Sequence, residues 1–580
     1  SQTYSSHSSH QVFLREYELN EEGRPVSTGK MGEGTPNGTK GGMATWQDLK
    51  EQAATKLGLR LADTDVANIP MLATDQYGRF LRGPKGLPQY ITKDNQLVEG
   101  DLGNPVAPPE NVQRIGIAFL DNISHHAVPF NSRTGAPLAA DSDAGITAPT
   151  GRQSAGTYDD EMLNAHFVAG DGRVNENIGL TAVHQVFHSE HNRLVDYMEE
   201  LLTSLHLDLN EWKLPNGEWN GERLFQAARF VTEMQYQHIV FEDFARKIQP
   251  GNNPFNVFTH SDTGINPPVK AEFAHPTYRF GHSMLTDRVD RKTNTGADIG
   301  LPLLDAFLNP PAYYANGGSP LTPEAAAGAV AMGMTDQVGA ELDEFVTDTL
   351  RNNVLGLPLD LAALNIARGR GTGVPSLNNF RKDLYRQTND SSLKPYTSWV
   401  DFGQALKHPD SVVNFMAAYG THPSITGATT IKDKRAAAQL LFDMDTTNPD
   451  TPADAFAFDN SAPDTEWATT EGRSATGVDA VDLWIGGLAE AQNLFGGLPG
   501  NTFNYIFERQ MTRLQDGDRL YYLSRTSGLY LRTQLEGNSM AELVMRNTNA
   551  AALKADVFGT ADCEFELGNI TAGSGNNVLD

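Results

Sequence analysis

Cysteine is almost absent from this chain, whose 580 residues include only Cys563. One thiol excludes an intrachain disulfide framework, a zinc ribbon, a CxxC redox pair and an iron–sulfur cluster with four cysteine ligands. A run of about 20 apolar residues, long enough to cross a bilayer, is also missing. Packing, bound ions or a cofactor must therefore stabilise the fold.

Basic residues are scarce: 45 lysines and arginines face 72 acidic residues, which gives a net charge of −27. Such a surface repels nucleic acid and anionic membranes and attracts cations. Hydrophobic residues make up 39% and charged residues 20%, close to ordinary globular usage. We therefore expect a folded protein with a sizeable core and no nucleic-acid partner.

The two ends of the chain are polar. The start, SQTYSSHSSHQ, lacks the basic and apolar regions of a secretory signal peptide, which favours a disordered or cut end of a longer chain. Residues 573–580, GSGNNVLD, resemble one turn of a calcium-binding nonapeptide repeat. A flexible tail is the favoured interpretation of residues 561–580, with a link to a calcium-repeat segment as the alternative.

Turn signals and apolar spacing divide the rest. Residues 1–110 predict an N-terminal arm, partly flexible, with a flexible lead-in to about residue 40, a helix at 46–56, and short strands and turns over 66–110. Residues 111–560 predict a mainly helical domain, with an acidic surface insertion at 443–475. Its expected helices lie near 115–127, 179–204, 220–246, 269–287, 338–351, 376–388, 479–492 and 502–514.

The most informative stretch is GDGRVNEN at 170–177, which leads into the helix pattern LTAVHQVFHSEHNRL at 180–194. It places Arg173 and Glu176 three residues apart at the start of an apolar helix. Buried charge is costly unless a ligand or partner offsets it. We therefore expect a specific polar partner here.

Three histidines of that helix, His184, His188 and His191, share one side at spacings of four and three residues. Imidazoles one turn apart can bind one metal ion, as in a zinc hydrolase. Histidines on an apolar face are more often hydrogen-bonded core residues, however, and Glu190 fits a buried polar network. The core interpretation is favoured.

Other polar groups interrupt apolar segments elsewhere. Asp121 precedes His125 by four residues, one turn of the predicted helix. His282 follows Gly281, which lets a large flat group approach the backbone. Asn365 and Arg368 lie in the apolar segment 359–370.

Taken in order, these motifs resemble those of the animal-type heme peroxidases of the peroxidase and cyclooxygenase superfamily. The family patterns GDxRxxE, EHNR, YRxGHS, LxAxNIxRGR, DLWxGGLxE and DGDRxYY are matched at 170–176, 190–193, 278–283, 361–370, 482–490 and 516–522. The resemblance covers roughly residues 112–530, and within the family the chain is similar to large secreted bacterial members. It implies a mainly α heme-peroxidase fold with minor short strands and long irregular loops.

The resemblance also implies roles for single residues. His282 resembles the proximal ligand of the heme iron, and Asn365 the residue that holds its other ring nitrogen. Arg368 matches the partner of a heme propionate, and Arg279 belongs to the expected heme-binding set.

On the opposite side of the heme, His125 resembles the distal acid–base histidine, and Arg173 the arginine that stabilises charge on the peroxide. Asp121 completes the expected catalytic set. Glu176 matches a carboxylate that forms an ester with a heme methyl group in the family.

Several positions depart from the family pattern. Ser124 replaces a second ester-forming aspartate and Asn177 a sulfonium-forming methionine, so at most one covalent heme link is expected. Asp121 replaces a distal glutamine, which argues against a specialised halide oxidase. His126 replaces a calcium-ligating aspartate, so calcium is left open, with Tyr158-Asp159-Asp160 as a different source of ligands.

We therefore expect a peroxidase with heme b, extracellular or at the cell surface, that reduces hydrogen peroxide to water while it oxidises small donors such as phenols, halides or Mn(II). Three alternatives remain: a zinc hydrolase, a heme-containing fatty-acid dioxygenase, and an adhesion or matrix protein that uses the fold as a scaffold. Arg279 disfavours the dioxygenase, because that branch has its radical tyrosine three residues before the histidine.

Overall fold

The chain divides into two compact units in a computed structural model. The structure describes residues 2–36, 40–147, 151, 153–205, 209–253, 264–352, 354, 357–493, 496–526, 528–529 and 531–560. The first unit contains residues 1–239, 287–338 and 528–580, and the second unit contains residues 240–286 and 339–527. The expected tail at 561–580, with Cys563, lies outside the described residues.

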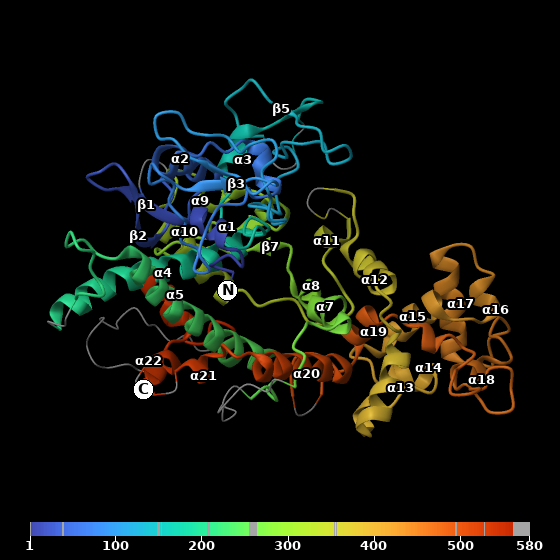
Figure 1. Ribbon diagram of the computed structural model, residues 1–580. Coiled ribbons are helices and arrows are strands. Elements are labelled where there is room, and N and C mark those ends of the chain that lie inside the picture. Colours follow the sequence, from blue (N-terminus) through green and yellow to red (C-terminus); the bar gives the residue numbers. More distant parts are fainter. Residues whose placement is uncertain are drawn as a thin grey trace. The chain divides into compact units, whose positions relative to one another are not determined.

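The first unit holds the long helices α4 and α5 and the short strands of the protein (Figure 1). Its elements are α1 (Ser8–Leu14), β1 (Arg15–Leu19), β2 (Pro25–Met31), α2 (Trp46–Leu57), β3 (Gln89–Ile91), β4 (Leu97–Glu99), β5 (Ala139–Ala140), β6 (Thr157–Tyr158), α3 (Asp160–Ala165), α4 (Ile178–Ser204), α5 (Gly221–His238), β7 (Arg288–Val289), β8 (Leu301–Pro302), α9 (Pro310–Tyr314), α10 (Pro323–Asp336), α22 (Leu531–Glu536) and α23 (Met540–Asn547).

The second unit consists of helices and irregular loops in its described part. Its elements are α6 (Arg246–Ile248), α7 (Ala271–Ala274), η4 (Thr277–Phe280), α8 (Gly281–Met284), α11 (Asp348–Asn352), α12 (Leu361–Gly371), α13 (Leu377–Thr388), η7 (Ser391–Leu393), α14 (Trp399–Gln404), η8 (Pro409–Ser411), α15 (Val412–Tyr419), α16 (Pro423–Thr426), α17 (Ile431–Asp443), α18 (Ala455–Asp459), η9 (Val478–Ala480), α19 (Leu483–Ala489), α20 (Asn501–Gly517) and α21 (Tyr522–Arg525).

The expected mainly α fold is confirmed, and each described sheet pairs only two strands. The helices predicted at 46–56, 179–204, 376–388 and 502–514 correspond to α2, α4, α13 and α20. The one predicted at 220–246 is α5 followed by a π-helical turn, Ile239–Ala245. In the described part of the chain no helix is both long and apolar enough to cross a membrane.

The ends of α2 and α4 show why these predictions held. The Thr45 hydroxyl accepts from the Asp48 amide and the Asp48 carboxylate accepts from the Thr45 amide, a reciprocal cap that contributes about 1 kcal/mol. Gly58, with φ of +67°, ends α2 in the left-handed conformation. The Asn177 side chain caps α4 by accepting from the Gly179 amide at 2.7 Å. Such local signals are readable in a sequence.

The helix predicted at 115–127 is wrong. Backbone groups there bond to a distant segment, because the Ile115 amide donates to the Ile69 carbonyl and the Phe119 amide donates to the Val66 carbonyl. Phe119 is completely buried in the core of the first unit, against Trp46 and Phe13. Tertiary pairing therefore overrides the apolar spacing that favoured a helix.

Two further helices differ from expectation. The segment 269–287 is broken into α7, η4 and α8, with Pro276 at the break after α7. The segment 338–351 is mostly loop: the Ala340 amide donates to the Met284 carbonyl at 2.9 Å, and helix begins only at Asp348.

Residues 2–36 are not a flexible lead-in. They form α1, β1 and β2, and Val12 and Phe13 are buried in the same core as Trp46. β1 and β2 pair antiparallel with a bulge between Arg15 and Tyr17. This segment is thus an integral part of the first unit.

Candidate active site

Arg173 and Asp171 form a bidentate ion pair in the loop before α4. The Arg173 Nε donates to Asp171 Oδ1 at 2.9 Å, and Nη2 donates to Oδ2 at 2.6 Å. The Arg173 side chain is 55% exposed and Glu176 is exposed too, so the expectation that this arginine and carboxylate are buried is wrong. Val174 occupies the core position instead. Sequence reasoning gave Asp171 no role, although a carboxylate two residues before an arginine could have signalled the pair.

The segment with Asp121 lies directly against this loop. Its amide donates to the Gly172 carbonyl at 2.9 Å, and a Cβ atom on Gly172 would lie 2.7 Å from the Asp121 nitrogen. Burial raises the pKa of the Asp121 carboxyl; nearby Asp171 raises it further and Arg173 lowers it. The structure therefore brings Asp121 and Arg173 together.

His125 lies in a turn whose flanks are anchored by backbone hydrogen bonds. The Ser124 amide donates to His166 Nε2 at 3.0 Å, and the His126 carbonyl accepts from the Asp159 amide at 2.8 Å. The anchored neighbours leave His125 exposed. Because this segment forms no helix, Asp121 and His125 do not share a helix face, and that expectation is wrong.

Glu176 is held by its backbone between the Arg173 turn and α4. Its amide donates to the Arg173 carbonyl at 2.9 Å, and its carbonyl accepts from the Leu308 amide at 3.3 Å. The carboxylate projects from an exposed residue. Glu176 therefore lies at the surface of the first unit and outside its core.

The histidines of α4 are core residues. His188 Nε2 bonds to the Gly32 carbonyl at 2.9 Å and His191 Nε2 to the Gly29 carbonyl at 3.0 Å. His184 is also buried, and burial lowers its pKa to about 4. None of the three belongs to a group of gathered metal-ligating atoms among the described residues. The metal-triad interpretation is wrong, and the core interpretation is confirmed.

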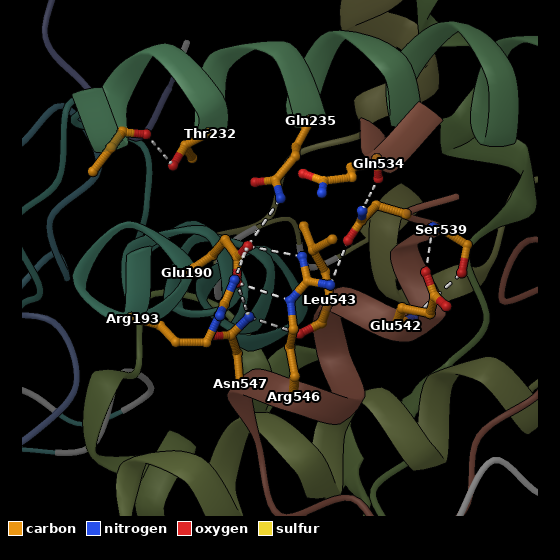
Figure 2. A network of polar contacts seen from close by, with 12 residues as sticks. Glu190, Arg193, Thr232, Gln235, Gln534, Ser539, Glu542, Leu543, Arg546 and Asn547 are labelled. Atoms are coloured by element: carbon orange, nitrogen blue, oxygen red, sulfur yellow. Dashed lines mark hydrogen bonds and ion pairs between the residues drawn. The ribbon is translucent and has the colours of Figure 1, made fainter. Parts of the chain in front are cut away.

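Glu190, in the same motif, is the centre of a buried polar network (Figure 2). Its carboxylate accepts from Arg193, Arg546, Asn547 and Gln235 at 2.7 to 3.1 Å. Burial alone raises the pKa of Glu190, but the two arginines outweigh it and hold the pKa at about 2. The network joins α4 to α23 and to α5.

In the second unit, Asn365 contacts His282. Asn365 Nδ2 lies 2.7 Å from His282 Nδ1, and Asn365 is completely buried in α12. Burial, with help from Arg279 and Arg368, lowers the pKa of His282 to about 4. The imidazole is therefore neutral at pH 7, the form that binds a metal ion.

The two arginines expected beside His282 lie in its electrostatic surroundings. Arg279 is in η4, where its carbonyl accepts from Trp484 Nε1 at 3.3 Å. Arg368 is one turn beyond Asn365 in α12 and is exposed. The structure thus brings together the expected set of the second unit.

Arg370 and Asp482 form an anchor to which sequence reasoning gave no role. Arg370 Nε and Nη2 donate to the two Asp482 oxygens at 2.9 and 2.5 Å, and the Tyr419 hydroxyl donates to Asp482 at 2.7 Å. The pair ties α12 to the start of α19. The sequence signal for this contact was that both residues lie in family motifs, Arg370 in 361–370 and Asp482 in 482–490.

The surroundings of His282 suit a histidine that binds a heme iron. Asn365 Oδ1 is buried and has no hydrogen-bond partner among the described residues. The two ends of an amide are interchangeable by rotation, and the rotated amide would accept the Nδ1 proton of His282. That tautomer leaves Nε2 with a free lone pair, which an iron ion requires.

Three carboxylates gather near Tyr158-Asp159-Asp160, the segment expected as an alternative source of calcium ligands. Ligand atoms of Asp141, Asp160 and Glu161 lie within 4.8 Å of one another. Asp160 was expected to contribute, whereas Asp141 and Glu161 were missed. Carboxylate oxygens are suitable ligands for a hard cation such as Ca²⁺.

A model of the animal haem peroxidase family matches residues 133–426 and 476–558, more than half of the chain. The chain therefore belongs to the animal heme peroxidase family. The match leaves out residues 427–475, which include the expected insertion at 443–475.

Named relatives agree with this assignment. The chain is 28% identical over 364 residues to peroxidasin homolog pxn-2 of Caenorhabditis elegans, covering 61% of this chain and 21% of the relative. It is 25% identical over 412 residues to thyroid peroxidase of Sus scrofa, covering 69% and 36%. The matches thus span well under half of these relatives. Peroxidase A of Dictyostelium discoideum aligns with a TM-score of 0.47 at 21% identity, covering 80% of this chain and 74% of that structure.

Proposed function

We propose that this protein is a heme peroxidase that reduces hydrogen peroxide to water and oxidises small donors such as phenols, halides or Mn(II). The contact between the buried Asn365 amide and His282 Nδ1 is the observation that carries the proposal. A heme held by His282 supplies the redox chemistry: two electrons from donors and two protons convert one H₂O₂ to two H₂O. Residues 111–560 would form the peroxidase domain.

His125 is the proposed acid–base group. An exposed imidazole on an anchored turn can take a proton from one peroxide oxygen and return it to the other. Arg173 would stabilise the negative charge that develops as the oxygen–oxygen bond breaks. Its present partner, Asp171, orients the guanidinium and Asp121 lies beside it.

The remaining expected residues would hold the heme. Arg368 would pair with a propionate, Arg279 would lie beside the proximal ligand, and Glu176 would form the single ester link. Arg279 in the place of a tyrosine supports a peroxidase over a fatty-acid dioxygenase. Mass spectrometry of a peptide containing Glu176, after turnover with peroxide, would show a heme adduct that Glu176→Gln lacks.

Two further parts of the proposal concern a calcium site and the place where the protein works. Asp141, Asp160 and Glu161 would bind Ca²⁺ close to the His125 turn, because the Asp159 amide bonds to the His126 carbonyl. The resemblance to secreted members of the family is the basis for proposing that the protein works outside the cell or at its surface. Chelation with EGTA should lower the melting temperature, and added Ca²⁺ should restore it.

The decisive test is the absorption spectrum of the purified protein before and after addition of hydrogen peroxide. A Soret band that shifts with peroxide is expected, and the shift should slow by a factor of about 10²–10³ in His125→Ala and Arg173→Ala. Arg133→Ala, which removes an exposed arginine elsewhere, is the matched control. Heme-loaded variants that react at the wild-type rate would refute these roles. A protein that binds zinc and no heme would refute the function itself.

A further inference from the structure

Glu341, Asp343 and His408 gather in the second unit, outside the heme-binding set. Glu341 and Asp343 lie in the loop before α11, and His408 directly precedes η8. One ligand atom from each lies within 4.8 Å of the others. We propose that these three side chains bind a divalent transition-metal ion of the zinc class.

His408 Nε2 and Asp343 Oδ2 form a hydrogen bond in this structure, and the same spacing of ligand atoms also fits a shared metal ion. His408 Nε2 lies 3.1 Å from Asp343 Oδ2 and 3.7 Å from Glu341 Oε2. Zinc bonds to nitrogen and oxygen of about 2.0–2.2 Å at tetrahedral angles place neighbouring ligand atoms about 3.4 Å apart. The two measured separations lie on either side of that value, so small side-chain movements would complete the site.

Phe345 holds two of the three ligands in place. Its amide donates to Asp343 Oδ1 at 2.8 Å, which leaves Oδ2 directed toward His408. Its ring packs edge-on against the His408 imidazole, with the ring centres 5.5 Å apart. The Asp343 side chain is only 9% exposed, so one ligand is firmly fixed. Such support for ligands from neighbouring groups is typical of metal sites.

Lys407 is the competing cation. Its Nζ donates to the Leu342 carbonyl and lies 3.6 Å from Glu341 Oε1, the oxygen turned away from His408. Glu341 therefore presents one oxygen to the lysine and the other to the site. The charges of the lysine and the two carboxylates sum to one negative charge, which still favours a divalent cation.

The ligand types decide the kind of ion. One imidazole and two carboxylates, without a thiolate, suit Zn²⁺ and its neighbours Co²⁺ and Ni²⁺, whereas Ca²⁺ and Mg²⁺ prefer oxygen ligands alone. Glu341 is 57% exposed and His408 37% exposed, so water can fill further positions. A bound ion would fasten the loop before α11 to the segment before η8.

Isothermal titration of the full chain, carrying its heme and freed of other metals by EDTA, with ZnCl₂ tests this proposal. The wild type should bind one Zn²⁺ that His408→Ala and Asp343→Asn weaken at least tenfold. A hundredfold excess of MgCl₂ should not displace it. Asp410→Asn is the matched control, because it removes an exposed carboxylate two residues from His408 that is not in the ligand set.

Equal binding by His408→Ala and wild type, or equal weakening by Asp410→Asn and Asp343→Asn, would overturn the site. If Asp343→Asn and His408→Ala do not fold, Glu341→Gln at the most exposed ligand decides the question. A melting temperature that rises with Zn²⁺ in the wild type but not in Glu341→Gln would support the proposal, and an equal rise in both would overturn it. Neither readout depends on peroxidase activity.

Discussion

Asn365 and His282 meet at 2.7 Å through the amide of one and Nδ1 of the other, with the amide completely buried. The contact fixes the ring of a histidine whose surroundings keep it neutral. In a helix as short as α8, of four residues, local structure alone would not orient the ring. The buried amide on α12 therefore does so from outside.

Replacement of Asn365 by leucine should weaken heme binding. The Nδ1 proton would lose its partner, and loss of such a partner costs about 10–100-fold in metal affinity or activity. Heme occupancy, measured from the ratio of the Soret band to protein absorbance, checks this. Leu364→Ala, an exposed neighbour on the same helix, should keep full occupancy. Unchanged heme content in Asn365→Leu would contradict the assigned contact.

Asp171→Asn should slow the reaction with peroxide without removing heme. The substitution would remove the charge of Asp171 and one of the two oxygens that accept hydrogen bonds from Arg173. We expect the rate to fall about tenfold, less than for Arg173→Ala. Stopped-flow recording of the Soret band measures the rate. Asp143→Asn changes an exposed aspartate elsewhere in the first unit and serves as the comparison. A rate equal to that of Arg173→Ala would mean that Asp171 does more than orient the arginine.

Glu190→Gln should destabilise the protein in a pH-dependent way. The pKa of Glu190 is about 2 in the folded protein against an ordinary value of 4.5, so its ionised form contributes about 3 kcal/mol above pH 4.5. That contribution is lost as the pH falls from 4.5 through 2. Urea unfolding at pH 7 and pH 3 should show a larger deficit at pH 7. The deficit should be the same at both pH values if the arginines do not stabilise the charged form.

Asp459→Asn should stabilise the protein at high pH, whereas Glu190→Gln destabilises it. Asp459 is completely buried in α18, both of its carboxylate oxygens are without a partner among the described residues, and burial raises its pKa to about 7 from 3.8. Its protonated form is compatible with folding, so stability falls as the pH rises from 3.8 through 7.

The asparagine removes this charge. The melting temperature of Asp459→Asn should exceed that of the wild type at pH 8, with little difference at pH 4. Asp450→Asn, an exposed change in the same loop region, should leave the melting temperature unchanged at both pH values. A variant that melts below the wild type at pH 8 would show that the charged carboxylate has a stabilising partner.

The sequence predicted elements whose signals are local. α4 and α13 have apolar spacing over many residues, and α2 has a complete cap, so each could be read without a structure. The segment 115–127 could not, because its amides bond to residues 66 and 69. Residues 2–36 have the composition of a flexible segment, yet they are held by groups from α4, which no local window contains.

The candidate site divides in the same way. The contact between His282 and Asn365, 83 residues apart, followed from the motif resemblance and from nothing local. Arg173 was singled out as a buried polar residue, but its exposure was not foreseen, because a short stretch does not show which of its residues faces the core. Asp171 and Asp482 were passed over because each acts through an arginine.

The bonds between α4 and the N-terminal hairpin have a practical consequence for anyone who trims this protein. His191, Asn192 and His188 bond to the backbone of residues 29–32, more than a hundred positions before the start of the family match. A shortened version that begins at residue 133 would strip these side chains of their partners in a dry interior. We expect it to be insoluble, however complete its catalytic motifs.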